Sequence, residues 1–307
     1  MTVREALTEA CAGLKQAGIE TANLDASLLL SKVLNTSRTM LLASAEEPLL
    51  HEMYITFNVL VERRQKGECT AYILGKKEFR GLEFLVNPSV LVPRPDTEIL
   101  VETAAAIIAE QSAAGNEEQK GEKNKKAAAD NLRVLDLCTG SGAAAVSLKH
   151  EMPDIEVWAT DISLEALETA KKNAERLLPD NNIRILHGDL YSALLTDNPL
   201  SPIPHFSLII SNPPYIPSDM IKTLPAEVQK EPLIALNGGK SGLEIIKRII
   251  NGAPENLIPG GALAIEADPR QMKKIVVLLE KRGFSNIIIY KDLSGQERVI
   301  TGKYNRK

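Results

Sequence analysis

Cysteine, aromatic residues and positive net charge are all scarce in this chain of 307 residues. The three cysteines, Cys11, Cys69 and Cys138, are odd in number and far apart, so no disulfide framework or metal-ligand spacing is visible. This usage is typical of a reducing cytosol. Aromatic residues make up 4% of the chain and the net charge is −4, so no overall field attracts nucleic acid.

Long apolar runs are also missing. No run approaches the ~20 residues that a membrane-spanning helix needs, and the N-terminus lacks the pattern of a signal peptide. The hydrophobic fraction of 44% and the charged fraction of 25% are ordinary for a soluble globular protein, and the length is enough for two domains. We therefore expect a cytoplasmic protein that is monomeric, with no membrane association and no direct nucleic-acid substrate.

The first 75 residues show helical periodicity. Thr2 and Glu5 have the spacing of a capping box, and Gly18 would end the helix that they begin. Two further apolar stretches cover residues 24–34 and 53–64. We expect a small helical bundle as a first domain, residues 1–75.

Two connecting segments differ from the rest of the chain. Residues 76–95 are expected to form a β-hairpin linker, with short strands at 79–86 and 90–92 around an Asn87-Pro88 turn. Residues 113–131 carry mixed charge and no large apolar side chain, so we expect a mobile surface loop there.

Strands and helices alternate through the remaining domain, residues 96–307. Strands are expected at 134–137, 155–160, 183–186, 206–211, 262–266, 287–290 and 298–301, and helices at 97–108, 143–148, 164–177 and 245–250. This alternation predicts an α/β fold with a doubly wound, parallel, Rossmann-like sheet of seven strands. Ligands bind such sheets outside the carboxyl ends of the strands.

The tetrapeptide Asn212-Pro213-Pro214-Tyr215 follows the apolar run 206–210. The asparagine oxygen can accept one N–H bond of a planar NH2 group, and a proline carbonyl has no N–H of its own residue beside it. The tyrosine ring can stack on the flat face of that group. The motif therefore favours transfer to an amide or an exocyclic amine, although Asn-Pro and Pro-Pro are also ordinary turn dipeptides.

A glycine-rich loop follows the first strand of this domain. Its residues are Asp136, Leu137, Cys138, Thr139, Gly140, Ser141 and Gly142. Glycine lets the backbone turn tightly and approach a ligand closely. Asp161 ends the next strand, where a carboxylate can accept hydrogen bonds from both hydroxyls of a ribose.

Two cofactors are compatible with such a loop. Residues 140–145 satisfy the G-x-G-x-x-G/A fingerprint of dinucleotide-binding proteins, so an NAD-dependent oxidoreductase is one interpretation. Asp136 opposes it, because an acid there would repel a pyrophosphate but could pair with an ammonium group. S-adenosylmethionine has a ribose, an adenine and a cationic amino-acid tail but no phosphate, so the acid favours this methyl donor. Asp189 could accept from the adenine amine and Leu190 could pack on the ring, although Asp189 could equally cap a turn.

Together these residues resemble the class I S-adenosylmethionine-dependent methyltransferases, and the full set resembles the HemK/PrmC family of N5-glutamine methyltransferases. The motif at 212–215 alone is shared with adenine-N6 DNA methyltransferases. The segment Val-Pro-Arg-Pro-Asp-Thr-Glu at 92–98 and the helical N-terminal region are more specific. The other matching segments are 72–75, 78–79, 136–142, 160–163, 188–189, 231–232, 235–236, 238–239, 292–295 and Arg298.

The resemblance implies an activity. A methyl group would pass from S-adenosylmethionine to N5 of a glutamine in the Gly-Gly-Gln loop of peptide chain release factors. S-adenosylhomocysteine would remain as product, and translation termination would be tuned. The helical domain would recognise this protein substrate.

The resemblance also implies which residues act. The glutamine would be held by residues 212–215, with Asn212, Pro213 and Tyr215 in catalytic roles. The donor would contact Asp136, Cys138, Thr139, Gly140, Ser141, Gly142, Asp161, Asp189, Leu190 and Asn212. Cys138 stands where glycine is common in the family, and Leu190 where tryptophan often occurs. Arg94, Thr97 and Glu98 either order the wall of the active site or simply begin a helix.

Three alternatives remain at this point besides the oxidoreductase. An adenine-N6 nucleic-acid methyltransferase would need a basic, aromatic-bearing target region, which this composition does not favour. The glutamine could belong to a different protein, such as a ribosomal protein. A binding module with a degenerate site is disfavoured by the intact motifs.

Overall fold

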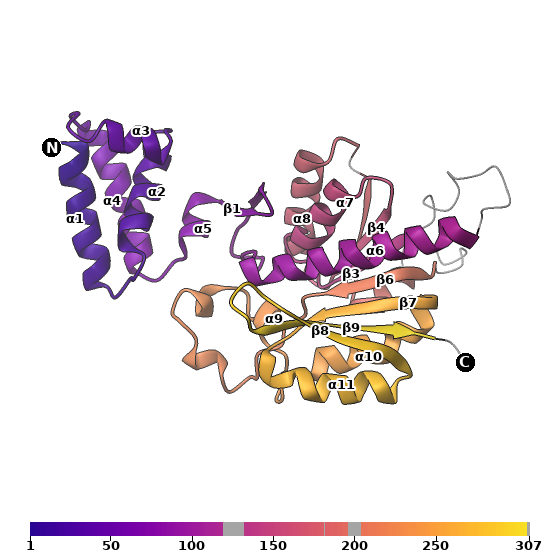
Figure 1. Cartoon of the computed structure of the whole chain (residues 1–307). Coiled ribbons are helices and arrows are strands. Elements are labelled where there is room, and N and C mark those ends of the chain that lie inside the picture. The colour runs from indigo at the N-terminus through magenta and orange to yellow at the C-terminus, as the bar shows by residue number, and fades with distance from the viewer. Residues whose placement is uncertain (119–131, 181, 196–203, 306–307) are drawn as a thin grey trace. The chain divides into compact units, whose positions relative to one another are not determined.

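The computed structural model describes residues 1–118, 132–180, 182–195 and 204–305 (Figure 1). The chain divides into two compact units, Met1–Lys76 with Leu224–Lys230, and Lys77–Thr223 with Glu231–Lys307. No sequence pattern indicated that a segment of the second half belongs with the N-terminal helices.

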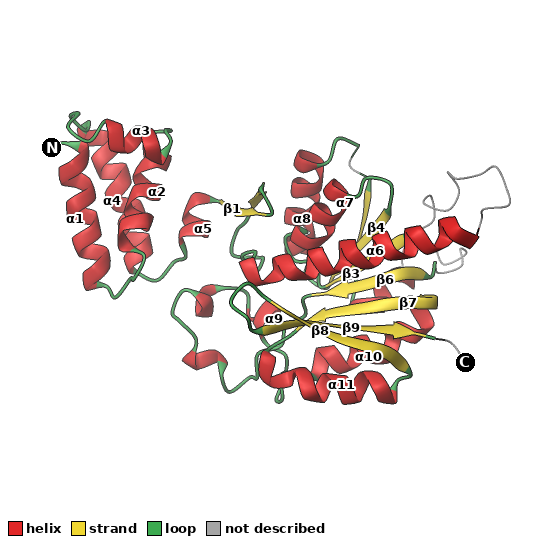
Figure 2. Cartoon of the chain, in the orientation of Figure 1, coloured by secondary structure: helices red, strands yellow, loops and turns green. Residues whose placement is uncertain are grey.

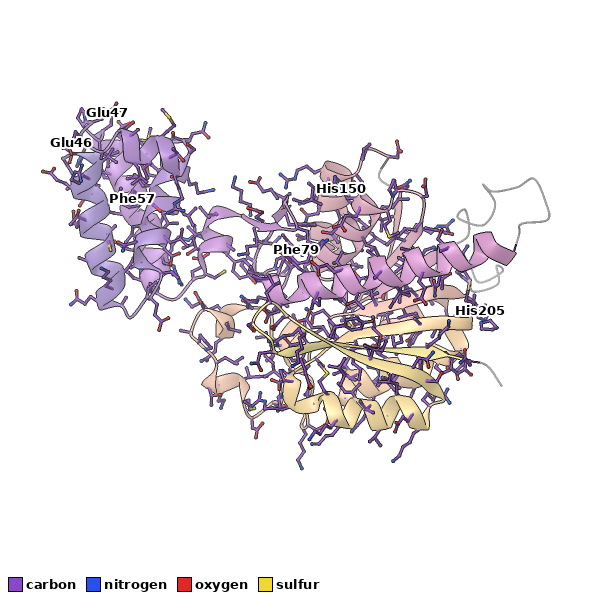
Figure 3. The ribbon with its side chains drawn as sticks, in the orientation of Figure 1. Glu46, Glu47, Phe57, Phe79, His150 and His205 are labelled. Atoms are coloured by element: carbon purple, nitrogen blue, oxygen red, sulfur yellow. The ribbon has the colours of Figure 1, made fainter. Side chains whose placement is uncertain are left out.

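The N-terminal unit is helical. It contains α1 (Val3–Gln16), α2 (Ala22–Val33), α3 (Arg38–Ala43), α4 (His51–Gln65) and α5 (Thr70–Leu74) (Figure 2). The predicted capping box is confirmed, because Thr2 Oγ1 accepts from the Glu5 amide at 3.2 Å and Glu5 Oε2 accepts from the Thr2 amide at 2.8 Å. Phe57 on α4 is fully buried in the core of this unit (Figure 3).

Arg64 joins the segment Leu224–Lys230 to the helices. Its guanidinium lies 2.8 Å from Asp25 on α2 and 2.8 Å from Glu227. The Arg64 and Asp25 side chains are both almost fully buried, so removing Arg64 would leave the Asp25 carboxylate without its charged partner in the core of the unit.

The β-hairpin differs from the prediction. Its strands are β1 (Lys76–Phe79) and β2 (Leu82–Leu85), and residues 90–92 form no strand. The turn lies at Arg80 and Gly81, whose φ angles of 50° and 73° are those of a two-residue type I′ turn. The prediction was wrong because Asn87-Pro88 was taken as the turn while the glycine inside the apolar run was treated as part of a strand.

Helix α6 (Glu98–Glu118) also extends further than expected. Residues 113–118, assigned to a loop from their composition, continue the helix. Ala113, Ala114, Glu117 and Glu118 have high helix propensity, whereas Gly115 and Asn116 do not, so propensity favours only part of this extension. The remainder of the expected loop, 119–131, lies outside the described residues. No described helix of the protein is long and apolar enough to cross a membrane.

The second unit is built on a seven-stranded sheet in the order β5-β4-β3-β6-β7-β9-β8. Its strands are β3 (Arg133–Leu137), β4 (Glu156–Asp161), β5 (Ile183–His187), β6 (Phe206–Ser211), β7 (Leu257–Glu266), β8 (Phe284–Lys291) and β9 (Glu297–Tyr304). The sheet is mixed, not purely parallel as predicted, because β9 runs antiparallel to both of its neighbours.

Helices cover both faces of this sheet (Figure 1). One face packs on α6, α7 (Ala143–Glu151) and α8 (Leu164–Leu177), and the other on α10 (Glu244–Asn256) and α11 (Met272–Lys281). Along β3, Val134 belongs to the first core and Leu135 to the second. Strands buried on both faces are largely apolar, so Asp136 and Asp161 near the carboxyl ends of β3 and β4, and Asn212 just after β6, are distinctive polar residues.

Candidate functional site

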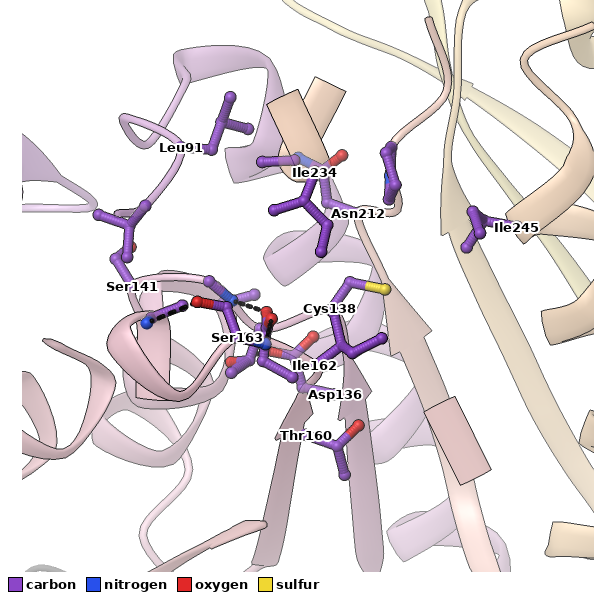
Figure 4. Close-up of a pocket in the computed structure, with 18 of the residues that line it drawn as sticks. Leu91, Asp136, Cys138, Ser141, Thr160, Ile162, Ser163, Asn212, Ile234 and Ile245 are labelled. Carbon is purple, nitrogen blue, oxygen red and sulfur yellow. Dashed lines mark hydrogen bonds between the residues drawn. The ribbon is translucent and has the colours of Figure 1, made fainter. Parts of the chain in front are cut away.

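A cavity of about 540 Å³ opens at the carboxyl ends of β3, β4 and β6 (Figure 4). The parallel strands bring together residues that are distant in sequence. From the glycine-rich loop, the cavity is lined by Asp136, Cys138, Thr139, Gly140 and Ser141, and from later strand ends by Asp161, Asp189, Leu190, Asn212 and Pro214. Of the residues predicted for this site, Gly142, Pro213 and Tyr215 do not line the cavity.

Asp136 is almost fully buried at the end of β3, with 1% of its surface exposed. Its Oδ2 accepts a hydrogen bond from Thr139 Oγ1 at 2.6 Å. Burial nevertheless raises the pKa of this carboxyl to about 7, because the charged form loses hydration, and nearby Asp161 adds to the rise. The cavity wall therefore holds an acid that can gain or lose a proton near neutral pH.

Asp161 ties the glycine-rich loop to the end of β4. Its Oδ2 accepts from the Gly140 amide at 2.8 Å, and its Oδ1 accepts from the Ser163 amide at 2.9 Å. Burial raises the pKa of Asp161, although these backbone hydrogen bonds oppose the rise. Each carboxylate oxygen has a second lone pair, so the group can still accept hydrogen bonds from a ligand.

Cys138 and Leu190 both lie at left-handed backbone positions, with φ of 61° and 52°. This conformation costs a residue with a Cβ about 1–2 kcal/mol, which explains why glycine suits the first of these positions. Asp189, the residue before Leu190, forms an ion pair with Arg248 of α10 at 2.7 Å. Arg248 also lines the cavity, and no sequence motif pointed to it.

Several hydrogen bonds fix the position of the loop after β6. Ser211 Oγ donates to the Leu137 carbonyl at 2.7 Å, and Asn212 Nδ2 donates to Thr97 Oγ1 at 3.0 Å. The Tyr215 hydroxyl lies 3.4 Å from Glu266 Oε1, so its ring is directed toward β7. The Gln271 side chain donates to the Tyr215 carbonyl at 2.9 Å.

Gly242 packs closely against the backbone of this loop. Its φ is 71°, and a Cβ atom there would lie 2.2 Å from the Tyr215 carbonyl oxygen. We expect Gly242→Ala to lower the free energy of unfolding by about 1–3 kcal/mol more than Gly295→Ala, because it adds overpacking against fixed backbone. Gly295 has a similar φ of 82° but nothing within 4 Å of the added atom, so it isolates the cost of the backbone conformation. Equal urea midpoints for the two variants would contradict this expectation.

Glu266 is a buried acid that the sequence did not single out. It ends β7 with 1% exposure, and its Oε2 has no hydrogen-bond partner among the described residues. Burial raises its pKa to about 7, while the neighbouring Thr97 hydroxyl and the charge of Arg298 oppose the rise. The available signal was its place as a polar residue at the carboxyl end of an apolar strand, as for Asp136 and Asp161.

The 92–98 segment contributes three residues to the cavity wall, Pro93, Arg94 and Thr97, whereas Glu98 does not line it. Arg94 forms an ion pair with the buried Glu231, whose other carboxylate oxygen accepts from the Val92 amide at 3.2 Å. The apolar side chains Leu233 and Ile234 also line the cavity and are more than half exposed. No group of metal-ligating side chains occurs in the described parts of the chain.

Two protein families match this chain. Residues 5–75 match the family described as PrmC N-terminal domain, and residues 123–226 match the methyltransferase small domain. The chain is 39% identical over 281 residues to the release factor glutamine methyltransferase of Neisseria gonorrhoeae, covering 92% of this chain and 93% of that protein. It is 36% identical over 303 residues to the enzyme of the same name from Geobacter sulfurreducens, covering 98% and 96%.

Solved structures give the fold. The hMettl16 catalytic domain in complex with MAT2A 3′UTR hairpin 1 matches with a TM-score of 0.54 at 15% sequence identity, over 81% of this chain and 80% of that one. At this identity the likeness shows the methyltransferase fold alone.

Proposed function

We propose that this chain, which belongs to the family of release factor glutamine methyltransferases, methylates N5 of a glutamine in a peptide chain release factor. The methyl donor is S-adenosylmethionine, and the target is the glutamine of the Gly-Gly-Gln loop. One structural observation supports the proposal in addition to the family membership: Asn212 and Pro214 line the same cavity as Asp136 and Asp161. Residues 212–215, which we call the amide-binding loop, and the two acids suited to a cationic nucleoside therefore contribute to one cavity.

The cavity suits the donor in size and charge. Its volume of about 540 Å³ falls in the range of small-molecule sites. Asp161 at the end of β4 supplies a ribose acceptor, and Asp136 supplies a negative charge for the ammonium of the amino-acid tail. Leu190 supplies an apolar surface for adenine, and Asp189, paired with Arg248, lies beside it. When bound, the donor would supply an electrophilic methyl group.

The chain's own contribution would be to hold and orient the amide nitrogen. A glutamine amide is a poor nucleophile because its lone pair is delocalised, so alignment is the main requirement. The Asn212 side-chain oxygen would accept one N–H bond, and the carbonyl of Pro213, the residue between the cavity-lining Asn212 and Pro214, would accept the other. Their partial negative charge would stabilise positive charge that develops on nitrogen. No strong base is needed, because the methylated nitrogen becomes acidic enough to lose its proton afterwards.

Tyr215 would act at the edge of this arrangement. Stacking of its ring on the substrate amide would require a rotation, because its hydroxyl is directed toward Glu266. We therefore propose that Tyr215 supports the loop in the structure described and packs on the amide once the glutamine has entered.

Donor affinity should depend on pH through Asp136. Its pKa of about 7 means that the carboxyl is largely neutral at pH 5.5 and increasingly ionised toward pH 7. A cationic ligand binds the ionised form, so the affinity for S-adenosylmethionine should rise across this interval, by up to about tenfold per pH unit. Calorimetric titrations from pH 5.5 to 7 would measure this slope. Asp136→Asn should bind more weakly and lose most of the pH dependence; a variant with the wild-type slope would exclude this role.

One labelling assay tests the function itself. The protein is incubated with methyl-labelled S-adenosylmethionine and a purified release factor, a ribosomal protein mixture or DNA, and the label is located by mass spectrometry. The expected result is one methyl group on the glutamine of the Gly-Gly-Gln loop, and none on a release factor carrying alanine there. Label on DNA or on ribosomal protein only would reject the proposal.

A further inference from the structure

The cavity wall includes an apolar surface that the roles described so far do not use. Leu233 and Ile234 belong to the short helix α9 (Leu233–Leu236) and line the same cavity as Asn212. Their exposed fractions are 58% and 52%, so more than half of each aliphatic side chain is in contact with water. In Figure 4, Ile234 lies on the Asn212 side of the cavity. Scattered exposed aliphatic residues need no explanation, but two adjacent ones in the wall of a ligand cavity face whatever enters it.

The C-terminal end of α9 is fixed against the amide-binding loop. The Ile216 amide, one residue beyond that loop, donates to the Leu236 carbonyl at 3.0 Å, and the Gly238 amide donates to the Ile216 carbonyl at 2.9 Å. Gly238 packs so closely that a Cβ atom there would lie 2.7 Å from the Pro214 carbonyl oxygen. The helix therefore lies beside the loop that would hold the target amide.

The N-terminal end of α9 is fixed as well. Glu231, two residues before the helix, is buried, and its carboxylate forms an ion pair with Arg94 and accepts from the Val92 amide at 3.2 Å. Both ends of the helix are therefore held by hydrogen bonds to other parts of the cavity wall. The two aliphatic side chains are presented by a fixed backbone, so their exposure is a property of the site.

The length of a glutamine side chain determines how close the substrate backbone must come. Four bonds separate the glutamine Cα from its amide nitrogen, so the backbone must come within about 5 Å of that nitrogen. The nitrogen lies about 3 Å from Asn212 Oδ1 when the two groups form a hydrogen bond. A protein that places its glutamine there must therefore bring main chain to the part of the cavity wall next to Asn212, which includes α9.

We propose that Leu233 and Ile234 form a docking surface for the substrate chain beside the target glutamine. This inference rests on the proposed function and extends it to residues that select the protein substrate. Aliphatic side chains offer no hydrogen bonds, so the surface favours chain that presents apolar atoms and disfavours charged side chains next to the glutamine. The two glycines before the proposed target glutamine fit this requirement, because each presents only a CH2 group.

The first experiment truncates this surface. The double substitution Leu233→Ala and Ile234→Ala removes most of the aliphatic atoms and keeps good helix formers. The KM for the release factor should rise about tenfold or more, because the lost side-chain surface no longer becomes buried on binding. At saturating release factor, kcat should stay within about threefold of wild type. The Kd for S-adenosylmethionine should be unchanged, which also verifies that the variant folds.

The control is Val277→Ala, which truncates a 45% exposed aliphatic residue of α11 and should leave all three constants at their wild-type values. An unchanged KM for the release factor in the double variant would overturn the inference. A loss of donor affinity instead would place the two side chains against S-adenosylmethionine and overturn it equally. Sedimentation velocity covers a further occupant. A wild-type dimer that the double substitution dissociates would show that the surface pairs two copies of this chain.

The second experiment changes polarity without changing shape. Ile234→Val and Ile234→Thr have side chains of nearly equal size that differ by one hydroxyl group. The KM for the release factor should stay within about twofold of wild type in Ile234→Val and rise about fivefold in Ile234→Thr, because an apolar contact buries the hydroxyl without a partner. Equal KM values would reject an apolar contact.

The two proposals fail differently. A wild-type protein that does not label the release factor sinks the function, whereas an active wild type with an unchanged KM in the double variant sinks only the docking surface.

Discussion

Asn212→Ala is expected to lower kcat for release-factor methylation by about 10²- to 10³-fold, with the Kd for S-adenosylmethionine within about threefold of wild type. The size follows from losing one fixed polar partner of a charge that develops in the transition state. The selectivity follows from geometry, because Asn212 forms its structural hydrogen bond with Thr97 and not with the glycine-rich loop. Single-turnover kinetics at saturating donor, together with calorimetry, separate the two effects.

The matched control is Asn251→Ala. Asn251 is an exposed residue of α10, and the hydrogen bond that Arg282 donates to it uses the backbone carbonyl, which the substitution retains. This variant should keep wild-type kinetics. Near-normal turnover in Asn212→Ala would remove the asparagine from the reaction and leave the amide-binding loop with a structural role only.

Asp161→Ala should have the opposite profile, with the main loss in donor binding. A carboxylate that accepts from ribose hydroxyls contributes charged hydrogen bonds, so we expect a loss of about 2–4 kcal/mol, or roughly 30- to 1,000-fold in Kd. The loss also includes disorder in the glycine-rich loop, because the Gly140 and Ser163 amides lose their acceptor. Equilibrium titration with S-adenosylhomocysteine measures the effect without turnover.

Two further variants separate these causes. Asp161→Asn keeps one oxygen acceptor but loses the charge, so its affinity should lie between those of wild type and Asp161→Ala. Asp154→Ala removes an exposed acid just before β4 and should bind the donor normally. Unchanged affinity in Asp161→Ala would show that the ribose is not bound at this strand end.

Local chemistry made much of the fold predictable. The Thr2 capping box forms as expected, and apolar strands ending in Asp136, Asp161 and Asn212 place those side chains at one edge of the sheet. The hairpin was misjudged because residues 79–86 look like one strand until the left-handed positions of Arg80 and Gly81 are known. Antiparallel β9 was missed because direction within a sheet depends on connections that periodicity does not encode.

The residues of the site were predictable where they belong to a recognisable sequence motif. Glu266 and Arg248 were missed because their interactions are with residues more than 50 positions away in sequence. Glu266 accepts from the Tyr215 hydroxyl, and Arg248 forms an ion pair with Asp189. Thr97 was named without a definite role, since only the structure shows that Asn212 donates a hydrogen bond to its hydroxyl. Tyr215 illustrates the converse, because its side chain was predicted from the motif but its direction toward Glu266 was not.

The segment Leu224–Lys230 has a practical consequence for dissecting this protein. The backbone leaves the second unit after Thr223, joins the helices for seven residues and returns at Glu231, whose side chain pairs with Arg94 at the cavity wall. Cutting the gene at residue 76 would therefore not release a self-sufficient catalytic half. Glu227 would lose Arg64, its ion-pair partner within the N-terminal unit. The N-terminal unit is therefore formed by two separate stretches of the sequence, and any truncation that divides the protein must keep both of them together.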